Sequence, residues 1–205
     1  DNDNDALVNV YANELKLSAS ASGKAVGKSN QHLETEVATF SGNVGSGGLF
    51  VTEATDITVN QTAVITVKRV ELNGSTLTDT TDALQNDLVS AGALVLQTVN
   101  GSITTAVTNG DIQATGHILL NASESVTTTV SGITLGGTVT TTSASNGSIS
   151  LTAQDFVHQL ATGDITAGGT GTIDVEVSTG TSSGAITKDD GAATASTSGN
   201  IRYVA

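Results

Sequence analysis

The chain has 205 residues, which is enough to bury the core of one domain. Its 7 basic and 20 acidic residues give a net charge of −13. This balance argues against nucleic acid and anionic membrane surfaces as partners, and it favours divalent cations or a saline exterior. The absence of cysteine excludes disulfides and thiolate metal sites.

Large side chains are scarce, since two Tyr, three Phe and no Trp or Met occur in the whole chain. The core must therefore consist of Val, Ile, Leu and Ala, which suit a thin, layered interior in which like residues stack on like. A compact globule of this size would draw on aromatic side chains for much of its buried area. The composition therefore predicts an elongated shape.

Two further features bear on what surrounds this chain. Because translation begins with Met, a chain without Met is expected to be a processed piece of something longer. No apolar run approaches the roughly 18 residues of a membrane span, and no signal peptide stands at the N-terminus. We therefore expect no membrane insertion.

The N-terminal part shows several runs in which apolar and polar residues alternate. The strands expected there are Val8–Leu17, Gly48–Val51, Asp56–Val59 and Ala63–Leu72, with a polar excursion over Ser18–Glu36. Asp79–Ala91 carries Leu84 and Leu88 at helical spacing. A short helix and an irregular loop remain the two interpretations of that segment.

From residue 92 onward one pattern recurs: Gly, a spacer, then a β-branched or aliphatic residue that opens an alternating run. Its ten copies begin at Gly92, Gly101, Gly110, Gly116, Gly137, Gly147, Gly163, Gly171, Gly184 and Gly199. Gly is expected to supply the positive φ of a tight corner. Successive aliphatic positions are about 12 residues apart on average, so two steps make roughly 20–25 residues, one coil of a parallel β-helix. The uneven steps favour corners of variable length over a propeller or a hairpin barrel.

Several longer strings carry a resemblance to a known class of proteins. They are Leu15–Gly27, Leu33–Val37, Gly47–Val59, Leu94–Ile103, Gly110–Ala122 and Gly199–Ala205. Together they resemble modules of the giant bacterial β-strand-repeat surface proteins, which are related in style to filamentous-haemagglutinin-type adhesins. The resemblance covers nearly the whole chain, although each motif is degenerate. It implies a right-handed parallel β-helix in an adhesin, sheath or fibre, and it carries no catalytic residues.

On this interpretation residues 1–205 form a single all-β, solenoid segment with variable corner loops, one module of a longer repetitive chain or filament. We expect it outside the cell or at the cell surface. The expected partners are copies of itself or neighbouring modules joined end to end, and surface carbohydrate or another cell.

Acidic residues at alternating positions make the N-terminus the one candidate metal site. Asp1, Asp3 and Asp5 are spaced like the first half of a calcium loop. Ala6 stands where a helix-loop-helix calcium site needs Gly, and Ala12 stands where it needs an acidic residue, so that type of site is excluded. An irregular Ca²⁺ site and a solvated acidic turn remain the two interpretations.

Other motifs carry weaker signals. Gly168–Asp174 superficially resembles the calcium-binding nonapeptide repeat, but Ile173 intervenes and nothing repeats. His32, His117 and His158 have no consistent partner spacing, so solvated or corner histidines are expected rather than a zinc site or a catalytic dyad.

Two alternatives to a purely structural role stay open. A polysaccharide-cleaving β-helix would need several carboxylates close to a basic residue, and the only arginines are Arg69 and Arg202. A ligand-binding adhesin module would need an aromatic patch, which would have to be built from the following residues: Tyr11, Tyr203, Phe40, Phe50 and Phe156.

Overall fold

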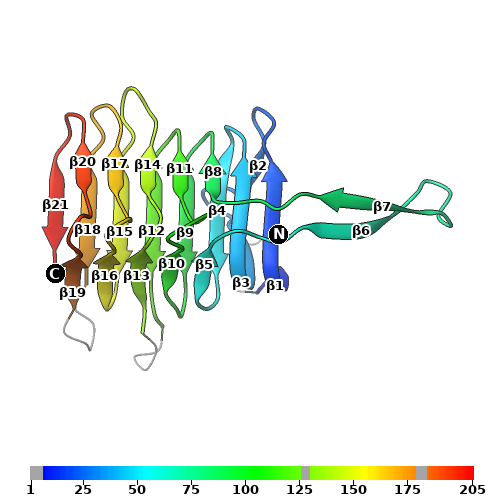
Figure 1. Ribbon diagram of the computed structural model, residues 1–205, viewed down its shortest axis with the longest axis horizontal. Helices are drawn as coiled ribbons and strands as arrows, with labels where there is room; N and C mark the ends of the chain where they lie inside the picture. Colours follow the sequence, from blue (N-terminus) through cyan, green and yellow to red (C-terminus); the bar gives the residue numbers. More distant parts are fainter. Residues whose placement is uncertain (1–6, 126–129, 179–183) are drawn as a thin grey trace.

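The computed structural model describes residues 7–125, 130–178 and 184–205. Nineteen strands of these ranges belong to one parallel hydrogen-bonded system, and two more form an antiparallel pair. Figure 1 shows the coils stacked side by side along one long axis. The prediction of a parallel β-helix is therefore confirmed. In the described ranges no helix is long and apolar enough to cross a membrane.

Three parallel sheets run the length of the solenoid, and each regular coil contributes one short strand to each of them. Sheet 1 contains β4 (Gly48–Glu53), β9 (Leu94–Thr98), β12 (Ile118–Ala122), β15 (Ile149–Ala153), β18 (Ile173–Val177) and β21 (Ile201–Val204). Sheet 2 contains β5 (Ile57–Val59), β10 (Ile103–Thr105), β13 (Gly132–Leu135), β16 (Phe156–Gln159) and β19 (Ala185–Lys188). Sheet 3 contains β8 (Leu88–Ser90), β11 (Ile112–Ala114), β14 (Val139–Thr141), β17 (Ile165–Ala167) and β20 (Thr194–Ser196).

The N-terminal coils use longer strands that turn from one sheet into the next. β1 (Val10–Ala19) pairs along its length with β3 (Leu33–Val44), and β2 (Ala25–Val26) pairs with β4. β3 in turn pairs with β4, β5 and β8, so it contributes to all three sheets. The remaining two strands, β6 (Ile65–Val70) and β7 (Leu77–Asp82), form an antiparallel hairpin inserted between β5 and β8.

The number of strands in a coil differs from the sequence-based expectation, and so does the length of two of the coils. The aligned positions Leu94, Ile118, Ile149, Ile173 and Ile201 give coils of 24, 31, 24 and 28 residues by subtraction of their numbers. The expectation that two motif steps complete a coil is wrong, because each coil has three strands and turns three corners. Corners of only a few residues fit three strands into a length that two longer ones were expected to fill.

The core consists of stacked columns of aliphatic side chains, one column for each inward position. In sheet 1 one column contains Leu49, Leu94, Ile118, Ile149 and Ile173, all at most 2% exposed. The alternating burial along each strand, seen as buried–intermediate–buried in β9, β12, β15 and β18, places every second residue inside. Small aliphatic residues therefore suffice to fill the thin interior, as the composition predicted.

The motif glycines are required for space and not for positive φ. None of the ten motif glycines is among the residues with positive φ in the described ranges. A Cβ on Gly199 would lie 2.1 Å from the carbonyl oxygen of Gly171, and a Cβ on Gly171 would lie 2.2 Å from that of Gly147. The backbones of successive coils thus approach too closely at these corners for any side chain. The sequence pattern therefore identified the corner glycines correctly, but the expected positive φ is not the reason why Gly is required there.

The segment Asp79–Ala91, for which a short helix or a loop was open, forms no helix. It contains the second half of β7 and the whole of β8. Leu88 is fully buried in sheet 3, whereas Leu84 is 51% exposed. Their helical spacing therefore does not reflect a shared face.

Glu53 places a charged side chain inside the solenoid, with no exposed surface. Glu53, at 0% exposure, accepts hydrogen bonds from Thr35 Oγ1 at 2.7 Å, from the Val37 backbone N–H at 3.1 Å, and from the N–H and hydroxyl of Thr55, both at 3.2 Å. Burial raises the pKa of Glu53 above its ordinary value, although these hydrogen bonds act to lower it. In later coils smaller residues fill the same position: Thr98, Ala122, Ala153 and Val177.

Truncating a core column should destabilise the whole solenoid. Leu120 is fully buried in β12, and we expect Leu120→Ala to lower the free energy of unfolding by about 2–5 kcal/mol, measured by urea denaturation. Leu119→Ala, on the outward side of the same strand, is the matched control and should cost less. Equal losses for the two variants would contradict the assignment of inward and outward faces.

Glu53 should give stability a particular dependence on pH. The folded state binds the Glu53 proton more tightly than the unfolded chain, in which the pKa is near its ordinary 4.5. The stability gained from this tighter proton binding is therefore fully present below that pH. It is lost as pH rises through the raised pKa of Glu53 in the folded state. We expect Glu53→Gln to remove this decline when unfolding free energies at pH 4 and pH 7 are compared. The exposed Glu36→Gln, on β3, should keep the wild-type decline.

Candidate end-to-end interface

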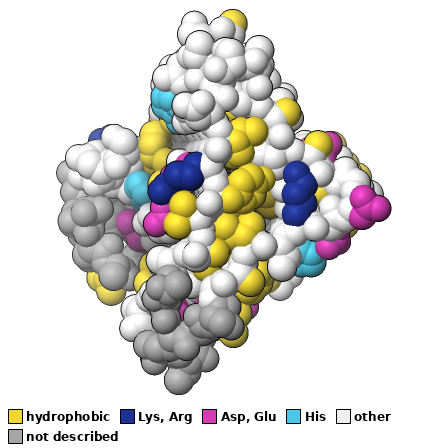
Figure 2. All heavy atoms as spheres, turned by 90° about the vertical axis from the view of Figure 1, so that its left-hand side faces the viewer, with side chains coloured by type: hydrophobic (Ala, Val, Ile, Leu, Met, Phe, Trp, Pro, Cys, Tyr) yellow, Lys and Arg dark blue, Asp and Glu magenta, His cyan; other side chains and the backbone are white. Residues whose placement is uncertain are grey.

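The C-terminal end of the described solenoid exposes side chains that belong to core columns. Ile201 and Tyr203 of β21 are each 42% exposed, whereas their register partners in β18, Ile173 and Val175, are at most 1% exposed. Figure 2 views this end and shows hydrophobic side chains gathered at its centre, with basic groups to either side. The last coil thus presents an apolar face along the solenoid axis.

Polar contacts hold this last coil in place. Arg202 forms an ion pair with Asp174, with Nε 2.7 Å from Oδ1, and a second one with Glu176. These carboxylates raise the pKa of the guanidinium. The Tyr203 hydroxyl lies 2.7 Å from Thr194 Oγ1, which joins sheet 1 to sheet 3 across the end. These contacts tie the last coil to the coil before it and join two of its sheets.

At the N-terminal end, β1 pairs on one side with β3, and no described strand pairs with its other edge. Tyr11 of β1 is 68% exposed. An edge strand with free N–H and C=O groups is a template for pairing with another strand. The two ends thus offer one unpaired edge and one uncovered core, which are the two parts of a stacking contact.

The β6–β7 hairpin gives the N-terminal end a third feature. Figure 1 shows that it leaves the corner between β5 and β8 and extends along the solenoid axis beyond β1. Its base is held on β1: the Ala63 N–H donates to Glu14 Oε2 at 2.9 Å, Lys16 Nζ donates to the Ala83 carbonyl, and Gln85 Nε2 donates to the Leu17 carbonyl at 3.1 Å. These three contacts fix the direction of the hairpin.

The hairpin itself contacts no core. It closes at a turn in which Gly74 has φ +71° and the Asn73 side-chain oxygen accepts from the N–H groups of Ser75 and Thr76. Several aliphatic side chains on it or at its base are more than half exposed: Val64, Val67, Val70, Leu72 and Leu77. At about 3.3 Å per residue, eight residues from Ile65 to Leu72 reach about 26 Å, or about five coil spacings.

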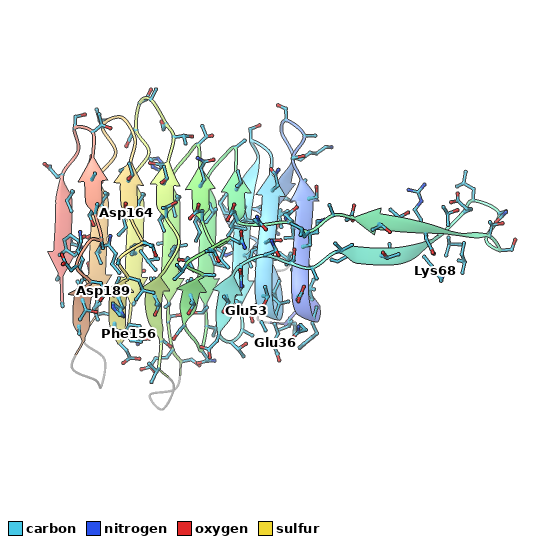
Figure 3. All side chains as sticks on the ribbon, viewed as in Figure 1. Glu36, Glu53, Lys68, Phe156, Asp164 and Asp189 are labelled. Atoms are coloured by element: carbon cyan, nitrogen blue, oxygen red, sulfur yellow. The ribbon has the colours of Figure 1, made fainter. Side chains whose placement is uncertain are left out.

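The hairpin carries charges of both signs, and on it Lys68 pairs with Asp79 at 2.8 Å. Lys68 and Arg69 lie on β6, and Figure 3 places Lys68 far out on the hairpin. The corner between sheets 2 and 3 carries Asp164 and Asp189 near the opposite end of the solenoid. A copy stacked against β1 would bring its own acidic corner alongside the hairpin.

The candidate metal ligands predicted from the sequence are not among the residues that the structure describes. Asp1, Asp3 and Asp5, the proposed Ca²⁺ ligands, lie outside the described residues, so that hypothesis stays a prediction. Among the residues that are described, no group of three or more His, Asp or Glu side chains could hold a metal ion.

The three histidines have different hydrogen-bonding partners. His32 Nδ1 lies 2.9 Å from Thr52 Oγ1, His117 Nδ1 accepts from the Ser148 N–H at 3.1 Å, and His158 Nε2 lies 2.9 Å from Asp189 Oδ1. Burial lowers the pKa of His32 in spite of nearby Glu34. Each ring makes its own local contact.

The aromatic residues are dispersed over the molecule. Tyr11 and Tyr203 lie on strands at opposite ends, and Phe40 is buried in the core at 1% exposure. Phe50 packs near His32, with ring centroids 6.0 Å apart. These residues therefore form no single aromatic patch.

Sequence reasoning missed the hairpin as a projection and treated Ala63–Leu72 as part of the solenoid. The signal was present in Asn73-Gly74, a dipeptide typical of hairpin turns, between two alternating runs.

No known protein family, curated protein or solved structure matches this chain.

Removing the anchors of the hairpin should loosen it without harming the solenoid. We expect Glu14→Ala with Lys16→Ala to speed amide hydrogen exchange in β6 and β7, because both side chains bond the backbone at the hairpin base. Exchange in β12 and β15 should not change. Lys68→Ala is the control, since its ion pair with Asp79 is solvent-exposed and contributes little. Unaltered exchange in the anchor variant would show that these bonds do not orient the hairpin.

Proposed function

We propose that this chain is a structural unit of an extracellular or cell-surface fibre or adhesin, in which solenoid units join end to end. The observation that carries the proposal is the C-terminal face, where Ile201 and Tyr203 occupy inward positions but are exposed. A further coil stacked on this face, from another unit or from the next module of a longer chain, would continue both the aliphatic columns and the backbone ladder. Stacked coils then supply reach and rigidity.

The N-terminal end supports the same arrangement. The free edge of β1 offers hydrogen bonds to the last coil of the next unit, and the axial hairpin extends far enough to lie along several of its coils. Its Lys68 and Arg69 would then lie beside the Asp164 and Asp189 corner of that unit. The hairpin thereby adds contact area between the two units and fixes the rotation of one unit relative to the other.

The surface location rests on the resemblance to giant bacterial surface proteins and on composition. An acidic chain without cysteine suits a saline, oxidising exterior, where a repetitive backbone ladder can supply the stability that disulfides supply elsewhere.

End-to-end joining can be tested on the single chain and on a tandem of two copies. We expect particles in micrographs to lengthen as protein concentration rises, and sedimentation to show the same growth. Two copies linked head to tail should unfold at a higher temperature than one, because the linker raises the effective concentration of each end.

The variant that tests this interface is Ile201→Lys with Tyr203→Lys, which puts charge on the apolar end face and should abolish both effects. Val130→Lys, at an exposed position on the corner between sheets 1 and 2, is the matched control and should leave them intact. A single chain that stays monomeric at every concentration, together with a tandem that unfolds like two separate units, would refute the proposal.

A further inference from the structure

Two cavities open on the outward side of sheet 1, one beside the N-terminal coils and one beside β12, β15 and β18. The first has a volume of about 620 Å³ and is lined in part by Glu34, Thr52 and Gln97. The second has a volume of about 250 Å³ and is lined in part by Asn121 and Thr152. Neither cavity takes part in the end-to-end contact proposed above.

Strand register shows that the two cavities follow one row. Glu34 is aligned with Thr52, Thr52 with Gln97, Gln97 with Asn121, Asn121 with Thr152, and Thr152 with Glu176. Each step is one strand spacing of about 4.8 Å, so five steps extend about 24 Å parallel to the solenoid axis. The row therefore offers a polar side chain at regular intervals across six coils.

The row is only partly satisfied by its own hydrogen bonds. Gln97 Nε2 donates to Thr52 Oγ1 at 2.8 Å, and Thr152 Oγ1 donates to Asn121 Oδ1 at 2.8 Å. Within the described residues, Gln97 Oε1 and Asn121 Nδ2 make no hydrogen bond. One end of each amide is therefore free to accept from, or donate to, a ligand.

Each cavity is lined by a glutamate that has one buried carboxylate oxygen without a hydrogen-bond partner. Among described side chains, Glu34 Oε2 and Glu124 Oε2 are the two buried polar atoms that have no hydrogen-bond partner. Glu34 is 7% exposed and lines the first cavity, and Glu124 lines the second. An unpaired buried carboxylate oxygen is costly, so a donor that reached either glutamate would stabilise its cavity.

Hydroxyl groups are one class of donor that fits both the carboxylates and the amides of the row. A metal ion is a poor fit, because the described residues contain no group of three or more His, Asp or Glu that could hold one. An anionic chain would be repelled by Glu34, Glu124 and the net charge of −13. Amides, hydroxyls and an isolated carboxylate instead complement groups that both donate and accept.

The first cavity also has an apolar side. Val8, Ala54 and Val99 line it together with the polar row. A sugar ring has polar edges and apolar faces, so it matches a wall of this mixed kind. A repeating polymer would in addition match a row whose positions recur at every coil.

We propose that the outward face of sheet 1 binds a neutral polysaccharide chain that lies parallel to the solenoid axis, with sugar hydroxyls donating to Glu34 and Glu124. The polar row binds further hydroxyls, and the free amide ends at Gln97 and Asn121 select for ligands longer than one ring. This binding does not depend on end-to-end joining, so the two proposals can fail separately.

Calorimetric titration with soluble neutral oligosaccharides of increasing length, drawn from glucans, mannans and xylans, tests the proposal. We expect at least one series to bind, with affinity rising with length up to about the extent of the row. Polygalacturonate of equal length, which is anionic, should bind more weakly.

Glu34→Gln should weaken binding about tenfold, because it removes a charge-assisted acceptor while keeping the side-chain shape. Glu36→Gln is the matched control: it is exposed on the same strand and should bind like the wild type. If Glu34→Gln lowers the unfolding temperature, Gln97→Leu is the second variant with which binding is measured. No binding by any neutral series, tighter binding of polygalacturonate, or equal affinities of the Glu34 and Glu36 variants would each overturn the proposal.

Discussion

The hydrogen-bonded stacking of one coil on the next is the constraint on which the rest of this structure depends. Strands such as β12 pair in parallel with the coil before and the coil after, so each residue lies directly above its equivalent. Equivalent positions therefore recur at strand spacing along the axis. Inside, this gives aliphatic columns; at the corners it brings backbones so close that only Gly fits, as at Gly171 and Gly199.

The same stacking leaves the two ends unlike the middle. In the middle, every column residue is covered on both sides, which is why Ile173 is buried. In the last described coil Ile201 has a neighbour on one side and is exposed. A solenoid has no closed edge, and its ends are natural joining surfaces. The hairpin held by Glu14 and Lys16 lies at one of these ends and extends in the direction in which another unit would stack.

On the outside, stacking turns single polar residues into a row. Thr52, Gln97, Asn121 and Thr152 are far apart in sequence but successive along sheet 1. A surface with a regular period suits a ligand with a regular period, whereas the unpaired oxygen of Glu34 breaks that regularity and marks where a ligand would bind most tightly. A fibre that also binds carbohydrate along its side would combine reach with attachment.

The sequence by itself determined the all-β class, the solenoid and the aliphatic core, because those follow from alternation, recurring Gly and the lack of aromatic residues. Only the tertiary structure decided that a coil has three strands, that Asp79–Ala91 contains β-strands and that Ala63–Leu72 leads into a projecting hairpin. The reason is that corner length and strand direction depend on which coil each segment packs against. The candidate surfaces could not be predicted from the sequence for the same reason. Glu34 and Gln97 line one cavity only because of the strand register across coils, and the local sequence pattern does not encode that register.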